Sequence, residues 1–251
     1  MDRRWPMSNI PVELIAILKS AERVVALTGA GVSQESGLRT FRDAQIGLWS
    51  QYKPEDLASP EAFERNPKLI WDWYASRREK NKQVSPNPGH YALSEMARRV
   101  PVFQLITQNV DGLHQRAGSV DVVELHGNIQ QVRCSLCGKM AQEWLENGQD
   151  VPKCSFCGGL LRPNVVWFGE SLPRPALETA VLAARGCEVF LSIGTSGLVQ
   201  PAASLAVAAK NQKACVVQVN IDPEPILAKV DFLLTGKSGE LLPEIVQAVW
   251  G

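Results

Sequence analysis

Short, mostly apolar runs recur along the chain and are separated by much longer stretches. The runs are rich in Val, Ile and Leu and do not alternate with polar residues, which is typical of strands buried on both faces. The stretches between them are long enough for the helices that connect parallel strands. The pattern therefore predicts an α/β fold with a parallel sheet and helices on both of its faces. The runs are Val24–Leu27, Val102–Ile106, Glu188–Ile193, Ala214–Val219 and Asp231–Leu234.

Two segments have the residue pattern of helices. Asn9 can cap a first helix that has Pro11 in its first turn and an apolar face beyond it. Trp71–Arg78 is also predicted to be helical, which puts Tyr74 and Arg77 on one face because they are three residues apart.

Two other stretches interrupt the alternation of strands and helices. Leu38–Pro60 is rich in turn formers and charges, which predicts either a mobile active-site loop or an ordinary surface connection. Ile129–Val165 contains paired cysteines and several glycines with little helical period, which predicts a small inserted module. We expect an N-terminal helix in residues 1–19, a discontinuous main domain in residues 20–128 and 164–251, and the module in residues 129–163.

Composition narrows the class of protein. Of the 251 residues, 45% are hydrophobic and 21% are charged, which is typical of globular proteins and excludes a disordered chain. Lys+Arg and Asp+Glu each number 26, so no net positive charge favours nucleic acid or an anionic membrane. The N-terminal segment fits neither a signal peptide nor a membrane anchor, and no apolar run approaches the ~20 residues of a spanning helix. We therefore expect a cytoplasmic protein without nucleic-acid or membrane partners.

Four of the six cysteines form the pattern C-x2-C-x16-C-x2-C. Each C-x2-C turn presents two thiolates, and the chain between the turns can bring both pairs into one tetrahedron. Four thiolates leave no open position for water, so we expect one structural Zn²⁺ rather than a catalytic one. The alternative is four free or disulfide-bonded cysteines. The predicted ligands are Cys134, Cys137, Cys154 and Cys157.

A glycine-containing segment follows the first predicted strand. Gly29–Gly37 is predicted to join this strand to a helix, so that its backbone N–H groups can approach a pyrophosphate. The full G-x-G-x-x-G pattern is absent because Gln34 occupies the third glycine position, and no acidic residue stands about 20 positions later. The segment therefore favours a dinucleotide-using enzyme other than a hydride-transfer dehydrogenase.

Polar residues are concentrated directly after the second predicted strand. Thr107–His114 holds two amides, an acid and an imidazole at a strand end, where open α/β sheets bind ligands. His126 stands beside Gly127, immediately before the cysteine module. Because a single histidine is more often structural than catalytic, both interpretations of His126 stay open on this observation alone.

Several motifs occur together and in order along nearly the whole chain. They are Gly29–Ser33, Thr40–Arg42, Thr107–His114, His126–Gly127, the two C-x2-C pairs, Val165–Glu170, Gly194–Ser196 and Asn220–Asp222. This combination resembles the sirtuin family of NAD-dependent protein-lysine deacylases. The resemblance implies a Rossmann-type, doubly wound NAD-binding domain with a small inserted zinc-ribbon domain, and a substrate that lies in the cleft between them.

The resemblance also implies roles for single residues. Asn109 and Asp111 correspond to the floor of the nicotinamide and ribose pocket, where developing positive charge is held in a dry polar site. His126 corresponds to the general base that accepts a proton from a ribose hydroxyl. The implied products are nicotinamide, O-acyl-ADP-ribose and free lysine. The residues implied to hold NAD are Gly29, Ala30, Gly31, Thr40, Phe41, Arg42, Gln108, Asn109, Asp111, Gly194, Thr195, Ser196, Asn220, Asp222 and, with less support, Ser238.

The implied partner is an acyl-lysine peptide. Phe168, Gly169 and Val199 correspond to two edges between which the peptide is added as an extended strand, unless these segments are plain loops. Tyr74 and Arg77 resemble the Y-x-x-R signature of the branch that removes succinyl and malonyl groups, because an arginine binds a carboxylate bidentately and a tyrosine donates a further hydrogen bond. The alternative is that Arg77 lies on a solvated helix face.

The sequence therefore predicts an NAD-dependent protein-lysine deacylase that acts on acetyl and acidic acyl groups. A mono-ADP-ribosyltransferase on the same scaffold is the alternative enzyme, and a non-catalytic NAD or acyl-lysine sensor is a third hypothesis. Asn109, Asp111 and His126 argue against the sensor, because a binding module needs no general base.

Overall fold

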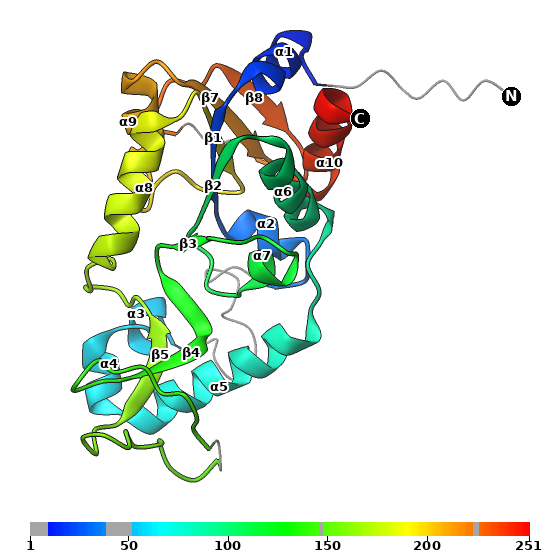
Figure 1. Cartoon of the computed structure of the whole chain (residues 1–251). Helices are drawn as coiled ribbons and strands as arrows, with labels where there is room; N and C mark the ends of the chain where they lie inside the picture. The colour runs from blue at the N-terminus through cyan, green and yellow to red at the C-terminus, as the bar shows by residue number, and fades with distance from the viewer. Residues whose placement is uncertain (1–9, 39–51, 146–147, 223–225) are drawn as a thin grey trace, which may run out of the picture.

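The centre of the molecule is a parallel sheet with the strand order β3-β2-β1-β6-β7-β8 (Figure 1). The computed structural model describes residues 10–38, 52–145, 148–222 and 226–251. The strands of this sheet are β1 (Arg23–Thr28), β2 (Val102–Thr107), β3 (Val123–Glu124), β6 (Val189–Ile193), β7 (Cys215–Asn220) and β8 (Phe232–Thr235). The five predicted strands are confirmed, each to within one residue at either end, whereas the short strand β3 escaped prediction.

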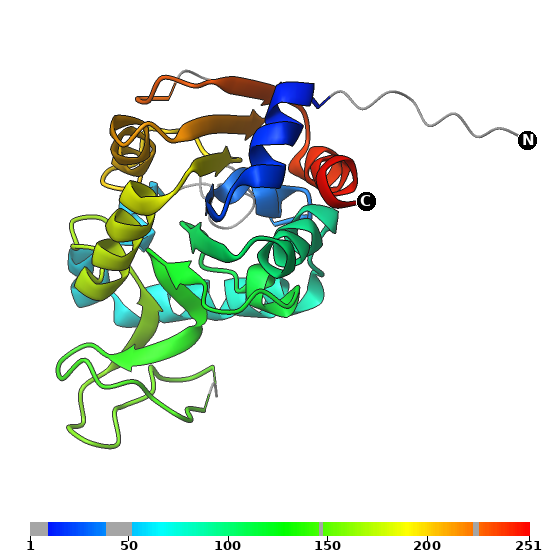
Figure 2. The ribbon, with the colours of Figure 1, turned by 45° about the horizontal axis from the view of Figure 1, so that its top comes forward.

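Helices cover both faces of the sheet because successive side chains of a strand point to opposite sides. On β1, Val24 and Ala26 belong to one buried apolar cluster, whereas Val25 and Leu27 belong to another. Figure 2 shows the helix layers on either side of the sheet. The first cluster is covered by α1 (Val12–Ser20), α6 (Pro88–Arg99) and α10 (Ser238–Trp250), and the second by α8 (Arg174–Gly186) and α9 (Ser204–Asn211). The doubly wound α/β prediction is therefore confirmed.

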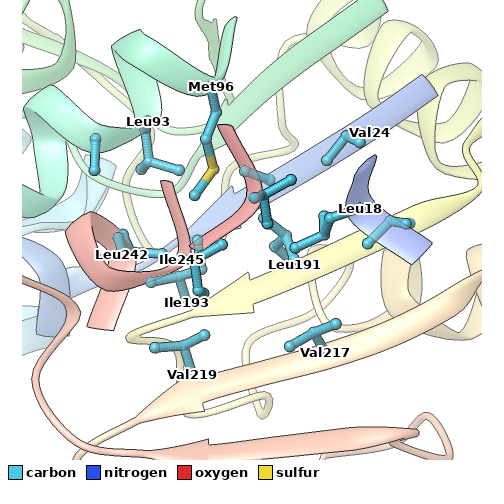
Figure 3. Packing of buried hydrophobic residues seen from close by; sticks show 14 of the residues in the cluster. Leu18, Val24, Leu93, Met96, Leu191, Ile193, Val217, Val219, Leu242 and Ile245 are labelled. Atoms are coloured by element: carbon cyan, nitrogen blue, oxygen red, sulfur yellow. The ribbon is translucent and has the colours of Figure 1, made fainter. Parts of the chain in front are cut away.

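The first cluster holds the sheet rigidly. Leu93 and Met96 of α6 meet Leu242 and Ile245 of α10 above the strands, and each of the four is at most 1% exposed (Figure 3). Burying such a side chain fully contributes about 1.5 to 3 kcal/mol, so this layer fixes the strand ends on which the site is built.

The carboxyl ends of β1 and β6 lie side by side at the point where the strand order reverses. The Gly29 N–H donates to the Ile193 carbonyl, and the Gly31 N–H donates to the Gly194 carbonyl, both at 3.0 Å. A Cβ added at Gly29 would lie 2.7 Å from the Gly194 oxygen, so the close approach requires glycine. Open α/β sheets bind their ligands at such a reversal.

The segment after β1 differs in detail from the prediction. Helix α2 (Ala30–Gln34) begins directly after Gly29, so Gly31 lies in a helix rather than in an extended loop. The predicted loop Leu38–Pro60 is wrong over its last part, because α3 (Pro54–Leu57) and the start of α4 (Pro60–Arg65) lie there. Residues 39–51 lie outside the described residues, and with them Thr40, Phe41 and Arg42.

The predicted helices are both present. Pro11 occupies the cap position of α1, whereas Asn9, the predicted cap, lies outside the described residues. The predicted helix Trp71–Arg78 is the middle of α5 (Pro67–Gln83). No helix within the described ranges is long and apolar enough to cross a lipid bilayer.

A second, two-stranded sheet lies beyond the main one. Strand β4 (Gly127–Cys134) pairs antiparallel with β5 (Leu161–Val165), and α3, α4 and α5 pack against the pair. Figure 1 shows this part below the main sheet. The module boundaries expected from the sequence, between residues 128 and 129 and between 163 and 164, fall inside these two strands.

Candidate active site

Asn109 and Asp111 belong to one hydrogen-bonded network at the carboxyl end of β2. Asn109 Nδ2 donates to the Gly29 carbonyl and to Ser33 Oγ, both at 2.9 Å. Ser33 Oγ in turn donates to Asp111 Oδ2 at 2.7 Å, and the Leu113 N–H donates to Asp111 Oδ1 at 2.9 Å. Asn109 and Asp111 are 8% and 9% exposed. The network fixes an amide and a carboxylate beside each other next to the strand reversal.

Helix α5 supports the same loop from the other side. Asn81 Nδ2 donates to the backbone carbonyl of Asp111 at 2.6 Å. Burial raises the pKa of Asp111 above its ordinary value, although hydrogen bonds from Leu113 and Ser33 oppose the shift. The sequence prediction gave no role to Asn81 or Ser33. Ser33 could have been found because it ends the glycine motif, whereas nothing in the sequence marks Asn81.

His126 lies between β3 and β4 and contacts the end of β2. Its Nδ1 is 2.8 Å from the Gln108 carbonyl oxygen, and because a carbonyl only accepts, Nδ1 carries the proton and Nε2 is the basic nitrogen. Burial lowers the pKa of His126 below the ordinary 6.5, and the hydrogen bond to Gln108 offsets part of this shift. The ring is therefore neutral at pH 7.

The residues predicted to hold the adenosine half follow β6 and β7. Gly194 packs against Gly31, and Asn220 Nδ2 donates to the Thr195 carbonyl at 3.0 Å. A small hollow at these strand ends is lined by Gln108 and Thr195, and also by Val199 from the predicted peptide edge. The structure thus brings candidates for the cofactor and the peptide to one place.

Other predicted residues are less closely tied to this hollow. Ser238, the first residue of α10, is 4% exposed, and its hydroxyl donates to the carboxylate of Glu35. Asp222 and Ala30 are exposed. The hydroxyl of Ser196 accepts from the Leu198 N–H at 3.4 Å. Nothing in this arrangement aims Ser238 at a ligand, so its adenine role stays a prediction.

Tyr74 and Arg77 are neighbours on α5. Tyr74 is 4% exposed and packs edge-on against Trp73 at 4.5 Å between ring centroids, and the Arg77 guanidinium lies 4.9 Å from the same indole ring. Burial raises the pKa of Tyr74 to about 12, although the charge of Arg77 lowers it. Burial lowers the pKa of Arg77, and the charges of Tyr74 and Asp111 oppose this. Arg77 is half-buried, so it does not lie on a fully solvated face.

The predicted peptide edges lie on the loops after β5 and β6. Phe168 and Val199 are 50% and 45% exposed, so both side chains reach the surface. The Phe168 N–H donates to the Ala58 carbonyl at 2.9 Å, and Gly169 has a φ of 85°, a conformation that favours glycine. The loop after β5 therefore has a defined backbone shape.

The four paired cysteines converge as the spacing predicts. Their sulfur atoms all lie within 4.8 Å of one another, with 3.4 Å between Cys134 and Cys157 and 3.8 Å between Cys137 and Cys154. A Zn–S length of about 2.3 Å puts the sulfurs of a regular tetrahedron about 3.8 Å apart. The donor set therefore fits one four-coordinate Zn²⁺, whereas disulfide bonds would need sulfur atoms about 2.05 Å apart.

Two buried histidines lie behind the network. His90 of α6 and His114 of α7 (Leu113–Arg116) are 0% and 1% exposed, with ring centroids 4.7 Å apart. His114 Nε2 is 2.9 Å from Thr28 Oγ1, and Thr28 Oγ1 donates to Thr107 Oγ1 at 2.9 Å. Burial lowers the pKa of His90 to about 4 and that of His114 to about 3. Both rings are therefore neutral at pH 7.

Acid should destabilise the protein through these two rings. In the unfolded chain His90 and His114 are protonated as the pH falls below 6.5, whereas in the folded protein they stay neutral until about pH 4 and pH 3. The free energy of unfolding is therefore highest above pH 6.5 and decreases as the pH falls. The loss approaches about 1.4 kcal/mol per pH unit for each ring well below pH 6.5, and the two rings together lose about 3 kcal/mol between pH 6.5 and 5. Urea unfolding at these pH values measures it. Because burial also lowers the pKa of His126, His114→Asn should remove about a third to a half of the histidine-dependent slope, and an unchanged slope would contradict the assignment.

Comparison with known proteins identifies the family. A sequence model of the Sir2 family matches residues 29–201. An NAD-dependent protein deacylase of Pyrococcus abyssi is 46% identical over 246 residues, which cover 95% of this chain and 97% of the relative. One of Aquifex aeolicus is 52% identical over 223 residues, which cover 88% and 93%. The fold matches a crystal structure of a Sir2 homologue in complex with NAD at a TM-score of 0.91 and 44% identity, over 96% of this chain and 94% of the other.

These matches agree with the geometry. They span the glycine approach at the strand reversal, the network of Asn109 and Asp111, the basic nitrogen of His126 and the four-cysteine cluster. The chain therefore belongs to the Sir2 family, the sirtuins.

Proposed function

We propose that this NAD-dependent protein deacylase removes succinyl and malonyl groups, as well as acetyl groups, from lysine side chains. The observation that carries the proposal is the half-buried Arg77 one helical turn after the buried Tyr74 on α5, with both side chains packed against the ring of Trp73. The deacylase activity itself is supported by the relatives of P. abyssi and A. aeolicus, which are named NAD-dependent protein deacylases. They do not favour the mono-ADP-ribosyltransferase alternative.

The residues at the strand reversal fit NAD. Gly29 and Gly194 allow the backbones after β1 and β6 to approach closely at the reversal, and Asn109 and Asp111 offer a fixed amide and carboxylate next to it. The structural match described as a Sir2 homologue with NAD supports this assignment. When bound, NAD supplies the ribose carbon that the acyl oxygen attacks and nicotinamide as the leaving group.

The chain's own residues then have separable tasks. Asn109 and Asp111 orient the nicotinamide and ribose end and keep it away from bulk water, because both are buried and held by Ser33. His126 accepts the ribose hydroxyl proton at Nε2, since Nδ1 is engaged with Gln108. The products are free lysine, nicotinamide and an O-acyl-ADP-ribose. A match at a TM-score of 0.88 and 44% identity, described as a Sir2 homologue mutant with 2'-O-acetyl ADP ribose, supports this outcome.

The peptide is expected to bind through its backbone. Phe168, Gly169 and Val199 belong to loops that reach the surface near the strand ends, and main-chain hydrogen bonds there would add the peptide as a strand. A match at a TM-score of 0.73 and 36% identity is described as bound to a myristoylated histone peptide, which supports an acyl-lysine substrate. We also propose that residues 129–163 fold around the metal as a separate module.

A panel of acetyl-, malonyl- and succinyl-lysine peptides, incubated with NAD and followed by mass spectrometry, tests the proposal. In Arg77→Met the loss of a charge-assisted contact of roughly 1.5 to 3 kcal/mol should lower kcat/KM for the succinyl peptide by about 10- to 100-fold. Deacetylation should fall much less because an acetyl group has no carboxylate. Tyr74→Phe should give the same asymmetry in milder form.

The control is Lys80→Met, which removes a positive charge from an exposed position of the same helix. It should leave the ratio of the two activities unchanged. Equal proportional losses for both peptides in folded Arg77→Met would reject the acidic-acyl pocket, and no change in any peptide with the unaltered enzyme would reject the activity.

A further inference from the structure

Trp167 makes a directional contact with the acyl pocket. It follows β5 and is 3% exposed, and its indole Nε1 lies 2.9 Å from the hydroxyl oxygen of Tyr74. An indole N–H can only donate, so the direction of this hydrogen bond is fixed: Trp167 donates and Tyr74 accepts. The sequence prediction assigned Trp167 no role, although it stands inside the Val165–Glu170 motif.

This hydrogen bond determines which further hydrogen bonds the Tyr74 hydroxyl can form. A phenol has a single proton, and Trp167 occupies the accepting side of the oxygen, so the proton must go to another acceptor. Among the residues that the structure describes, Trp167 is the only hydrogen-bond partner of this hydroxyl. A hydroxyl that accepts one hydrogen bond also becomes a better donor of the next, because the bonds polarise each other. Tyr74 is therefore prepared to donate to an anionic ligand.

The indole is held firmly from two directions. The Trp167 backbone N–H donates to Glu170 Oε2 at 2.8 Å, and Arg162 binds both carboxylate oxygens of Glu170 at 2.6 and 2.9 Å. The Arg162 guanidinium also lies on the indole face, 3.3 Å from the ring centroid, and Phe63 packs against the ring at 5.4 Å between centroids. Arg162 is 6% exposed, so this ion pair is largely shielded from water. The N–H of Trp167 therefore has little freedom to turn away.

We propose that Trp167 is a positioning residue for acidic acyl groups: its indole N–H orients the Tyr74 hydroxyl so that the phenol proton is donated to the acyl carboxylate bound by Arg77. The proposal rests on the proposed function and deepens it. It concerns selectivity rather than the chemical step, because an acetyl group offers no carboxylate to receive the proton. The loss of the N–H should therefore change the ratio of desuccinylation to deacetylation.

The experiment removes the donor in two ways. Trp167→Phe removes the N–H with part of the ring, and incorporation of benzothienylalanine at position 167 replaces the N–H by sulfur while keeping the two-ring shape. In both, kcat/KM for a succinyl-lysine peptide should fall about 3- to 10-fold relative to that for the matching acetyl-lysine peptide. Trp71→Phe is the control, because Trp71 is also a buried tryptophan of this region but contacts Arg78 and a different cluster.

A double-mutant cycle separates positioning from packing. If Trp167 acts through the hydroxyl, Trp167→Phe should cause no further change in the ratio when Tyr74 is already phenylalanine. An equal fall in both activities with benzothienylalanine, or a full additional fall of the ratio in the Tyr74→Phe background, would overturn the proposal. If Arg77→Met shows the acidic-acyl asymmetry while the position-167 variants do not, the proposed function stands and only this inference fails. If the unaltered enzyme leaves succinyl-lysine intact, both fail.

Discussion

Replacing His126 with alanine should lower the deacylation rate by about 10²- to 10⁴-fold, the usual contribution of a general base. The reason is geometric, because Nε2 is the single basic nitrogen that the hydrogen bond to Gln108 leaves on this ring. NAD binding should change little, since the network of Asn109, Asp111 and Ser33 does not include His126. Turnover of an acetyl-lysine peptide and calorimetric titration with NAD measure the two quantities separately.

The pH profile of the unaltered enzyme is a second measurement of the same role. The base must be neutral to accept a proton, and burial lowers the pKa of His126 below 6.5. Activity should therefore persist at pH 6.5 and decline only at lower pH. Turnover of His126→Ala near that of the unaltered enzyme would show that another group takes the proton.

Removal of the metal should have the second large effect. Cys134→Ser deletes one of four sulfur ligands, and a structural Zn²⁺ contributes folding free energy directly. We expect a zinc content well below one ion per chain and a loss of several kcal/mol, which lowers the Tm by about 10 °C in a protein of this size. Elemental analysis and a thermal scan give both values, and a strong chelator should have the same effect on the unaltered chain.

Cys215→Ser is the matched control for the cysteine ligand. Cys215 lies half-buried in β7, away from the four-cysteine cluster, so this variant should keep its zinc and lose little stability. A metal-free protein with the same Tm as the zinc-loaded form would show that metal binding by the four thiols does not stabilise the fold.

The features that the sequence predicts correctly are those with a local cause. Val24–Leu27 is apolar at every position, and Ala214–Val219 is apolar at every position except Gln218, because both faces of each strand are covered by helices, so the run itself reveals the strand. The cysteine spacing is equally informative, because four thiolates at that spacing close one coordination shell. Tyr74 and Arg77 needed only the helical period to be put on one face.

Most features that escaped prediction depend on partners that are distant in the sequence. The hydrogen bond between Trp167 and Tyr74 joins residues 93 positions apart, and no local pattern specifies such a pairing. The same holds for His90 and His114, which meet only when α6 packs beside α7. The helix missed inside the predicted loop is α3, whereas α4 begins at Pro60, where that loop was predicted to end, and the Ser59 hydroxyl caps it by accepting from the Ala62 N–H at 3.2 Å.

Helix α5 carries Tyr74, Arg77 and Asn81 at spacings of three and four residues, so one stripe of the helix serves two purposes. The first two residues of the stripe belong to the proposed acyl pocket, and the third donates a hydrogen bond to the backbone carbonyl of Asp111, which we propose to lie in the nicotinamide region. A substitution on this stripe that alters the acyl preference leaves the position of Asp111 unchanged only if the axis of α5 does not move. A shift of α5 along its axis would also displace Asp111. A changed KM for NAD would therefore show that a redesign of the acyl pocket had moved the helix.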